Sequence, residues 1–98
     1  MNIQAMMKQA QNLQKNMMKE KEAIDNQVFE GKSSLVSVKV TGDKKIQSIK
    51  IESKDFELDD IEMLQDMIVI AVNQAMDEID KVTNEKLGKY TQGLPGLF

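Results

Sequence analysis

The chain contains no cysteine, no histidine and no tryptophan among its 98 residues. Without cysteine and histidine it can form no disulfide, no thiolate or imidazole metal site, and no Ser-His or Cys-His catalytic pair. Proton transfer could use only Asp, Glu, Lys and the single tyrosine, Tyr90, and a domain of this length rarely builds the cleft that such chemistry needs. We therefore expect a binding or structural protein that is not an enzyme and uses no cofactor and no small-molecule substrate.

Arginine is missing as well, since all 13 basic residues are lysine. A lysine ammonium is a point charge, so the chain has no guanidinium fork for bidentate recognition of guanine or phosphate. The longest apolar run, residues 67–72, is far shorter than the ~20 residues that span a bilayer. The N-terminus has no basic stretch followed by an apolar core and a cleavage site. We therefore expect a cytoplasmic protein with no membrane partner.

What the chain does have is the composition of a small globular protein, with 41% hydrophobic and 30% charged residues. Its length predicts one domain, which we place at residues 1–89, followed by a flexible tail over residues 90–98 that contains Pro95 and two glycines. The net charge of −3 hides an asymmetry, because residues 1–54 hold ten lysines and six acids whereas residues 55–98 hold three lysines and ten acids. The two halves should therefore differ in electrostatic potential.

The first 27 residues have the pattern of a long amphipathic helix. No glycine or proline occurs between positions 2 and 27, and apolar residues recur mostly at steps of three and four. These positions form an apolar seam: Ile3, Met6, Ala10, Leu13, Met17 and Ile24. At 1.5 Å per residue the helix would be roughly 37 Å long, which is more than the core of a small domain can cover. Part of it should therefore project from the domain or meet a partner.

After Gly31 the apolar pattern changes to a period of two. Valines alternate with polar residues over positions 36–41, which predicts a half-buried strand, and a Gly-Asp turn signal follows at positions 42–43. Isoleucines alternate with polar residues over positions 48–51 and predict a returning strand, while residues 27–30 could supply a third. We therefore expect a three-stranded antiparallel sheet and an α+β fold.

A second helical pattern begins at Ile61, after an acidic stretch over residues 55–60, and continues to about Gly88. Its regularly spaced apolar residues are Leu64, Ile68, Ala71, Ala75, Ile79 and Val82. Residues 67–72 are apolar on every side of this helix and therefore need cover from several directions. One small sheet and one neighbouring helix hardly supply that cover, so we predict a homodimer.

Four segments of the chain, taken in order, carry a resemblance to a known family. They are Met6-Met7-Lys8-Gln9-Ala10-Gln11, Leu35-Val36-x-Val38-x-Val40-x-Gly42, Ile49-x-Ile51, and Asp60-x-Glu62-x-Leu64-x-Asp66-x-Ile68 with Ala71-x-Asn73-x-Ala75. Together they resemble the YbaB/EbfC family of bacterial nucleoid-associated proteins over nearly the whole chain. The resemblance implies binding of double-stranded DNA, with little or variable sequence specificity, in the nucleoid of the bacterial cytoplasm.

The resemblance also implies an intertwined homodimer whose two long N-terminal helices protrude like the arms of tweezers. The two chains would be joined through the sheet and the second helix. We place eight residues at this interface: Val36, Val38, Leu64, Met67, Ile68, Ala71, Val72 and Ala75. Members of the family commonly carry a run of glycines before the Leu-Val strand, where this chain has Ser33-Ser34.

One side of the N-terminal helix is the candidate DNA-binding surface, which we name the outer face. Its residues follow one another at steps of four, three, four and four, roughly opposite the apolar seam: Gln4, Lys8, Gln11, Lys15 and Lys19. No acid precedes Glu20, so the outer face is locally positive. Its ammonium groups could neutralise phosphates and its amides could bond to phosphate oxygens or base edges. The alternative is an ordinary solvated helix face. Lys44 and Lys45, in the expected turn, are secondary candidates.

The acidic residues between Asp55 and Asp66 invite comparison with a calcium-binding loop. The position that requires glycine in such a loop holds Asp60, and helical periodicity already begins at Ile61, so we predict no metal site. Acids at the start of a helix interact favourably with its dipole, which explains much of the cluster without a metal.

The eight methionines suggest a different class of function. Their flexible thioether side chains can line an adaptable surface for unfolded clients. The order of helix, strands and helix also resembles prefoldin-type chaperone subunits, although their helices are considerably longer. A protein-binding chaperone or adaptor is therefore the alternative to a DNA-binding protein.

Overall fold

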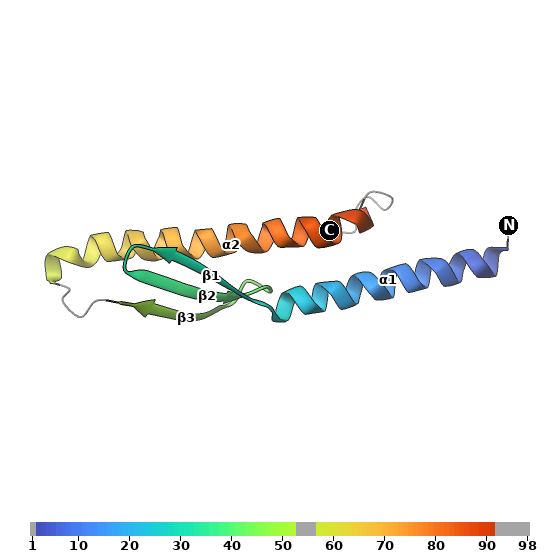
Figure 1. Ribbon diagram of the computed structural model, residues 1–98, viewed down its shortest axis with the longest axis horizontal. Helices are drawn as coiled ribbons and strands as arrows, with labels where there is room; N and C mark the ends of the chain where they lie inside the picture. Colours follow the sequence, from blue (N-terminus) through green and yellow to red (C-terminus); the bar gives the residue numbers. More distant parts are fainter. Residues whose placement is uncertain (1, 53–56, 92–98) are drawn as a thin grey trace.

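The computed structural model describes residues 2–52 and 57–91 and has the α+β fold that the sequence predicts. The elements in order are α1 (Ile3–Asn26), β1 (Val28–Ser33), β2 (Val36–Thr41), β3 (Ile46–Ile51), the short 3₁₀ helix η1 (Leu58–Asp60) and α2 (Ile61–Thr91). The molecule is elongated, with principal extents of 71 × 20 × 14 Å, because α1 leaves one end of the sheet and runs away from it (Figure 1).

The three strands form one antiparallel sheet in the order β1-β2-β3. Val38 at the centre of β2 pairs with Gly31 on β1 and with Ile49 on β3. β1 is longer than the strand expected at residues 27–30, and Gly31, which the pattern placed between two strands, lies inside it. Glycine is needed at this position because the backbone of α2 packs directly against it.

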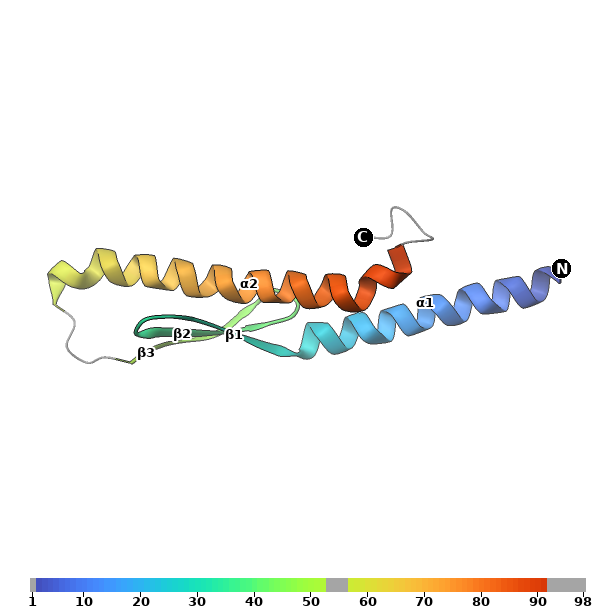
Figure 2. The same ribbon diagram turned by 45° about the horizontal axis from the view of Figure 1, so that its top comes forward.

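α2 covers one face of the sheet and packs mainly on β1 and β2 (Figure 2). The valines of β2 are fully buried beneath it, opposite the small side chains of Ala71 and Ala75. Small residues let the helix axis approach the sheet closely, and the approach is closest at Gly31. A Cβ atom built on Gly31 would overlap the backbone carbonyl oxygen of Ala71, so only glycine fits there.

α1 is attached to the rest of the fold only through its C-terminal half. Met17 and Ile24 of the apolar seam are buried, and they belong to the same core cluster as residues of α2 and the sheet. Every side chain from position 2 to position 16 is exposed. The N-terminal half of α1 therefore projects beyond the domain, as its length predicted.

The C-terminal end of α2 differs from the prediction. The helix continues through Gly88 to Thr91, and Tyr90, assigned to the flexible tail, is 5% exposed and part of the core. Leu87 and Tyr90 join the buried cluster that contains Met17 of α1. This packing outweighs the cost of about 1 kcal/mol for a glycine inside a helix. The remaining positions of the expected tail, 92–98, lie outside the described residues.

Candidate nucleic-acid interface

The projecting half of α1 presents the whole outer face to solvent. Asn2 is the N-cap of α1, and its side-chain oxygen accepts a hydrogen bond of 3.0 Å from the backbone N–H of Gln4. All five residues of the outer face are exposed. Between Gln4 and Lys19 they extend over about 22 Å of helix at 1.5 Å per residue. The structure thus brings the predicted residues together on one accessible side of one helix.

The outer face carries positive charge that forms no ion pair in the described part of the chain. Within the described ranges, Lys8, Lys15 and Lys19 form no ion pair with a carboxylate. The first acid of the helix, Glu20, is instead held by Lys89 of α2, with 3.1 Å between Oε1 and Nζ. The hydrogen bond to Glu20 and its charge raise the pKa of Lys89 above its usual value. This pairing directs the carboxylate of Glu20 toward α2.

A shallow, open hollow of ≈ 450 Å³ lies along this side of α1. Its lining residues are Gln11, Gln14, Lys15, Met18, Lys19 and Glu22. Most of the polar groups are hydrogen-bond donors that suit phosphate oxygens, and Glu22 lies at the end nearest the domain. Lys8 and Lys19 are about 16 Å apart along the helix axis, which corresponds to about five base pairs of duplex. The arrangement suits an extended polyanion.

The two lysines of the β2–β3 turn are placed differently, because both are paired with acids. Lys44 Nζ lies 2.9 Å from Asp80 Oδ1 on α2, and Lys45 Nζ lies 3.7 Å from Asp43 Oδ2. A hydrogen bond donated by the Thr41 hydroxyl, and to a smaller degree the charge of Lys45, lower the pKa of Asp43. The Lys45 pair lies within the turn and the Lys44 pair joins the turn to α2, so both lysines offer less unpaired charge than the outer face does.

The acidic stretch before α2 takes part in the local backbone structure. The backbone N–H of Glu57 donates a hydrogen bond of 3.0 Å to Asp60 Oδ2, which closes the turn of η1. Asp55, the first position of the rejected calcium loop, lies outside the described residues. Among residues 2–52 and 57–91, no three His, Cys, Asp or Glu side chains are grouped to hold a metal ion. Over the same ranges, no helix is long and apolar enough to cross a bilayer.

The residues expected at a dimer interface fall into two groups. The first group is fully buried in the core of the single chain and has almost no surface left for a partner: Val36, Val38, Ala71 and Ala75. The second group is only partly buried, at the margin of the same core: Leu64, Met67, Ile68 and Val72. Only the second group keeps surface that a partner could cover.

Sequence reasoning missed the apolar surface of β3. Ile49 and Ile51 are paired with Val38 and Val36, so they point toward the same side of the sheet as the buried valines. They are nevertheless 45% and 41% exposed, because α2 is centred on the other two strands. The alternation of isoleucines was visible in the sequence. The lateral position of α2 over the sheet was not.

Comparison with known proteins identifies the family of the chain. The family model described as the YbaB/EbfC DNA-binding family matches residues 1–94. The chain belongs to this family. It is 50% identical over 99 residues to a nucleoid-associated protein of Ligilactobacillus salivarius, covering 99% of this chain and 95% of that protein. It is also 50% identical over 97 residues to a nucleoid-associated protein of Lactococcus lactis subsp. cremoris, covering 97% and 98% of the two chains.

The fold of this YbaB/EbfC family member is also similar to a solved structure. The crystal structure of the uncharacterized protein HP0035 from Helicobacter pylori matches with a TM-score of 0.70 and 19% sequence identity, over 94% of this chain and 97% of that one. The agreement confirms the arrangement of an N-terminal helix, a three-stranded sheet and a C-terminal helix. The description of the family names DNA as what its members bind.

Proposed function

We propose that this YbaB/EbfC family protein binds double-stranded DNA through the outer face of α1, with little sequence specificity and without catalysis. The observation that carries the proposal is the unpaired positive charge of Lys8, Lys15 and Lys19 on a helix that projects into solvent. The relatives from Ligilactobacillus salivarius and Lactococcus lactis are named nucleoid-associated proteins, which supports a place in the bacterial nucleoid and hence in the cytoplasm.

The residue types on the outer face favour contacts with the DNA backbone. Lysine ammonium groups bind phosphates as point charges, and the flanking amides of Gln4 and Gln11 can bond to phosphate oxygens. No arginine is available for the bidentate pairing with guanine that is the commonest specific contact in the major groove. Binding of this kind holds DNA firmly at low salt and discriminates little between sequences.

We further propose that the protein acts as a homodimer that presents two such arms. On the α2 side of the sheet, Ile49 and Ile51 of β3 form apolar surface beside the helix. Gln74 of α2 accepts a hydrogen bond from the backbone N–H of Lys32 on β1, at 2.6 Å. Because residues two apart on a helix point in nearly opposite directions, Val72 faces the β3 side. A second chain that packs there would cover both apolar surfaces.

The salt dependence of binding tests the backbone mode. Three lysines on each of two arms give at most six phosphate contacts, so the logarithm of affinity should fall with the logarithm of salt concentration at a slope of about −5 or shallower. Fluorescence anisotropy with one fixed-sequence duplex and one random-sequence duplex, at several salt concentrations, measures both the slope and the sequence preference. Absence of binding to either duplex at low salt, or an affinity that salt does not change, would contradict the proposal.

A charge-matched pair of variants locates the interface. The variant K8Q/K15Q/K19Q removes three charges from the outer face and should lose most of its affinity for both duplexes. The control K50Q/K81Q/K86Q removes the same charge from exposed lysines on β3 and α2, none of which pairs with an acid in the described part of the chain. Equal losses in the two variants would show that net charge, and not the outer face, determines binding. A chaperone would instead suppress client aggregation equally well in both variants.

A further inference from the structure

The apolar seam of α1 is covered at one end and exposed at the other. Met17 is 8% exposed and shares a core cluster with Tyr90, which lies one residue before the end of α2. Toward the N-terminus of the seam, Leu13 is 45% and Ile3 is 71% exposed. A helix that lacks packing is only marginally stable in water, so a partner on the exposed half of the seam would stabilise it.

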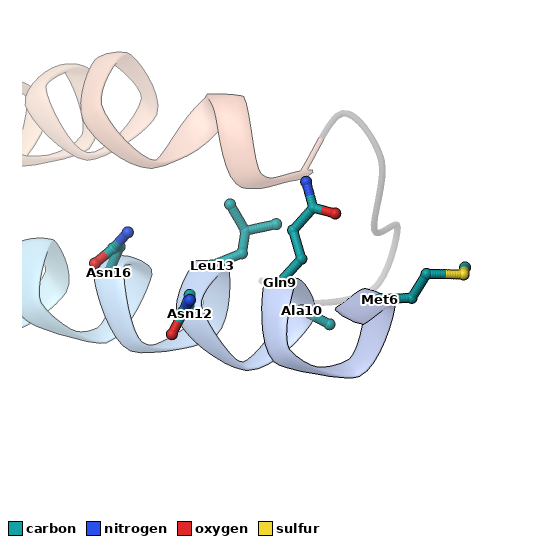
Figure 3. A pocket seen from close by; sticks show the side chains of 6 residues that line it. All are labelled: Met6, Gln9, Ala10, Asn12, Leu13 and Asn16. Carbon is teal, nitrogen blue, oxygen red and sulfur yellow. The ribbon is translucent and has the colours of Figure 1, made fainter. Parts of the chain in front are cut away.

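The exposed half of the seam borders an open pocket of ≈ 480 Å³. Its lining residues carry no charge: Met6, Gln9, Ala10, Asn12, Leu13 and Asn16. Figure 3 shows Gln9 and Leu13 pointing from α1 toward the side on which α2 ends, while Met6 lies nearer the free end of the helix. The lysines of the outer face lie on the opposite side of α1. A partner on the seam would therefore bury no charge of this helix.

We propose that the exposed half of the seam binds the same half of a second copy, with the two α1 helices antiparallel. Treated as the two rows of a coiled-coil seam, the helices interlock when Ile3 faces Leu13 of the second copy. In the same register Met6 faces Ala10 of the second copy, and by symmetry each of these layers occurs twice. A long side chain then meets a small one in both central layers, over about 15 Å of helix in total.

The position of α2 determines the orientation. α2 packs on the seam of its own α1 at Met17, so a parallel pair would have to fit both α2 helices between the two α1 helices about one turn beyond Leu13. Helices in direct contact have axes only about 8–10 Å apart, which leaves no room for them. In the antiparallel pair, Met17 lies beyond the start of the second copy's helix at Ile3. That helix and α2 then cover the seam one after the other.

The same geometry selects the register. A shift of one heptad toward the domain would run the second copy's helix into α2, and a shift in the other direction would lose half of the apolar layers. The contact is about 15 Å long and one helix wide, about 10 Å, which is less than the ~800 Å² per partner of a stable interface. The association should therefore be weak and depend on protein concentration.

The pairing leaves both outer faces in solvent, on opposite sides of the helix pair. Lys8 and Lys15 face away from the second copy, so their charges do not oppose the contact. If each outer face holds its own duplex, which rests on the proposed function, the contact joins two duplexes. The contact itself needs no DNA.

Single cysteines can report the register, because the chain has no cysteine of its own. Equal amounts of Ile3→Cys and Leu13→Cys protein, mixed under oxidised glutathione, should form the mixed disulfide at least about tenfold faster than a disulfide between like chains. In the antiparallel pair, like positions are about 15 Å apart along the axis, and a disulfide needs Cα atoms within about 7 Å. The layer at the other end keeps its natural Leu13 and Ile3, so the mixed pair is altered in one layer only. Mass spectrometry of the non-reduced protein measures the products.

The control replaces Leu13→Cys by Gln11→Cys, which places the thiol on the outer face. Its mixed disulfide with Ile3→Cys should form at least about tenfold more slowly. Equal rates for the Leu13 and Gln11 variants would mean that the disulfides arise from random collision. Fastest formation between two Ile3→Cys chains would mean that the helices are parallel. Either result would overturn the proposal.

A second measurement compares two neighbouring substitutions that add the same charge. Ala10→Glu would bury a carboxylate in the contact, whereas Gln11→Glu places one on the outer face, and both positions are exposed in the single chain. In sedimentation equilibrium at about millimolar concentration, Ala10→Glu should show about half the mass of Gln11→Glu, or less. Equal masses would overturn the proposal. Neither experiment involves DNA, so failure here leaves the DNA-binding proposal standing on its own test.

Discussion

At the scale of single residues, Gly31 allows α2 to lie close to the sheet because it has no side chain. Gly31 meets the backbone of α2, and a Cβ there would overlap the Ala71 carbonyl oxygen. Since backbone cannot rotate away as a side chain can, Gly31→Ala should push α2 off the sheet and lower the free energy of unfolding by about 2–3 kcal/mol. Urea denaturation followed by circular dichroism measures the change. An unchanged midpoint would show that the helix shifts at no cost.

At Ser34, in the turn between β1 and β2, a substitution to glycine should stabilise the protein, whereas replacing the glycine at position 31 should destabilise it. The φ of Ser34 is 50° and lies in the left-handed region, which costs a residue with a Cβ about 1–2 kcal/mol and costs glycine little. Ser34→Gly should therefore raise the free energy of unfolding by up to about 1 kcal/mol, after the greater flexibility of glycine in the unfolded chain is counted. The control Ser37→Gly, inside β2, should instead lower it by about 0.5–1 kcal/mol. Thermal and urea unfolding of both variants compare the signs.

At the scale of helices and strands, periodicity predicted which elements exist, and tertiary packing determined where they end. The three-four spacing over α1 and α2 and the alternation in β2 each gave the correct element. The sequence pattern predicts element boundaries at Gly31 and Gly88, but Gly31 lies inside β1 and Gly88 inside α2. Packing of other residues holds both elements in place across these glycines. In α2, for example, Tyr90 is buried in the same core cluster as Met17 of α1. Sequence alone contains no measure of that packing.

The two glycines differ in what surrounds them, which leads to opposite expectations for the same substitution. A Cβ on Gly88 would meet no atom within 4 Å, apart from its neighbours and its own helix backbone. Gly88→Ala should therefore stabilise α2 by about 0.5–1 kcal/mol through helix propensity and a less flexible unfolded chain. Compared with the unsubstituted protein, Gly88→Ala should unfold at a higher urea concentration and Gly31→Ala at a lower one. A lower midpoint in Gly88→Ala would mean that the helix needs a glycine there.

At the scale of the whole molecule, two surfaces of different chemistry lie at opposite ends of a long shape. The projecting half of α1 carries unpaired lysines at one end, and β3 with the start of α2 carries exposed isoleucines and valine at the other (Figure 1). The first surface could be predicted from sequence, because it depends on the spacing within one helix. The second could not be divided correctly into core and surface, because burial depends on where α2 lies over the sheet. Val36 is buried and Ile51 exposed according to whether α2 covers them, and Ala71 is buried and Val69 exposed according to whether they face the sheet.

The second surface makes a prediction that links assembly to DNA binding. Ile49→Glu places a charge on the uncovered apolar face of β3, where burial against a second chain would cost several kcal/mol. If the protein is the proposed homodimer, sedimentation should therefore change from about twice the chain mass of 11.1 kDa to that of a single chain. The control Ser48→Glu, on the other face of the strand and opposite Lys39, should sediment as the unsubstituted protein does.

The Ile49→Glu monomer would have one arm in place of two and so at most three phosphate contacts. The slope of the logarithm of DNA affinity against the logarithm of salt concentration should therefore become shallower, at about −3. A variant that stays dimeric would place the interface elsewhere, and a monomer with an unchanged slope would mean that both arms were never engaged together.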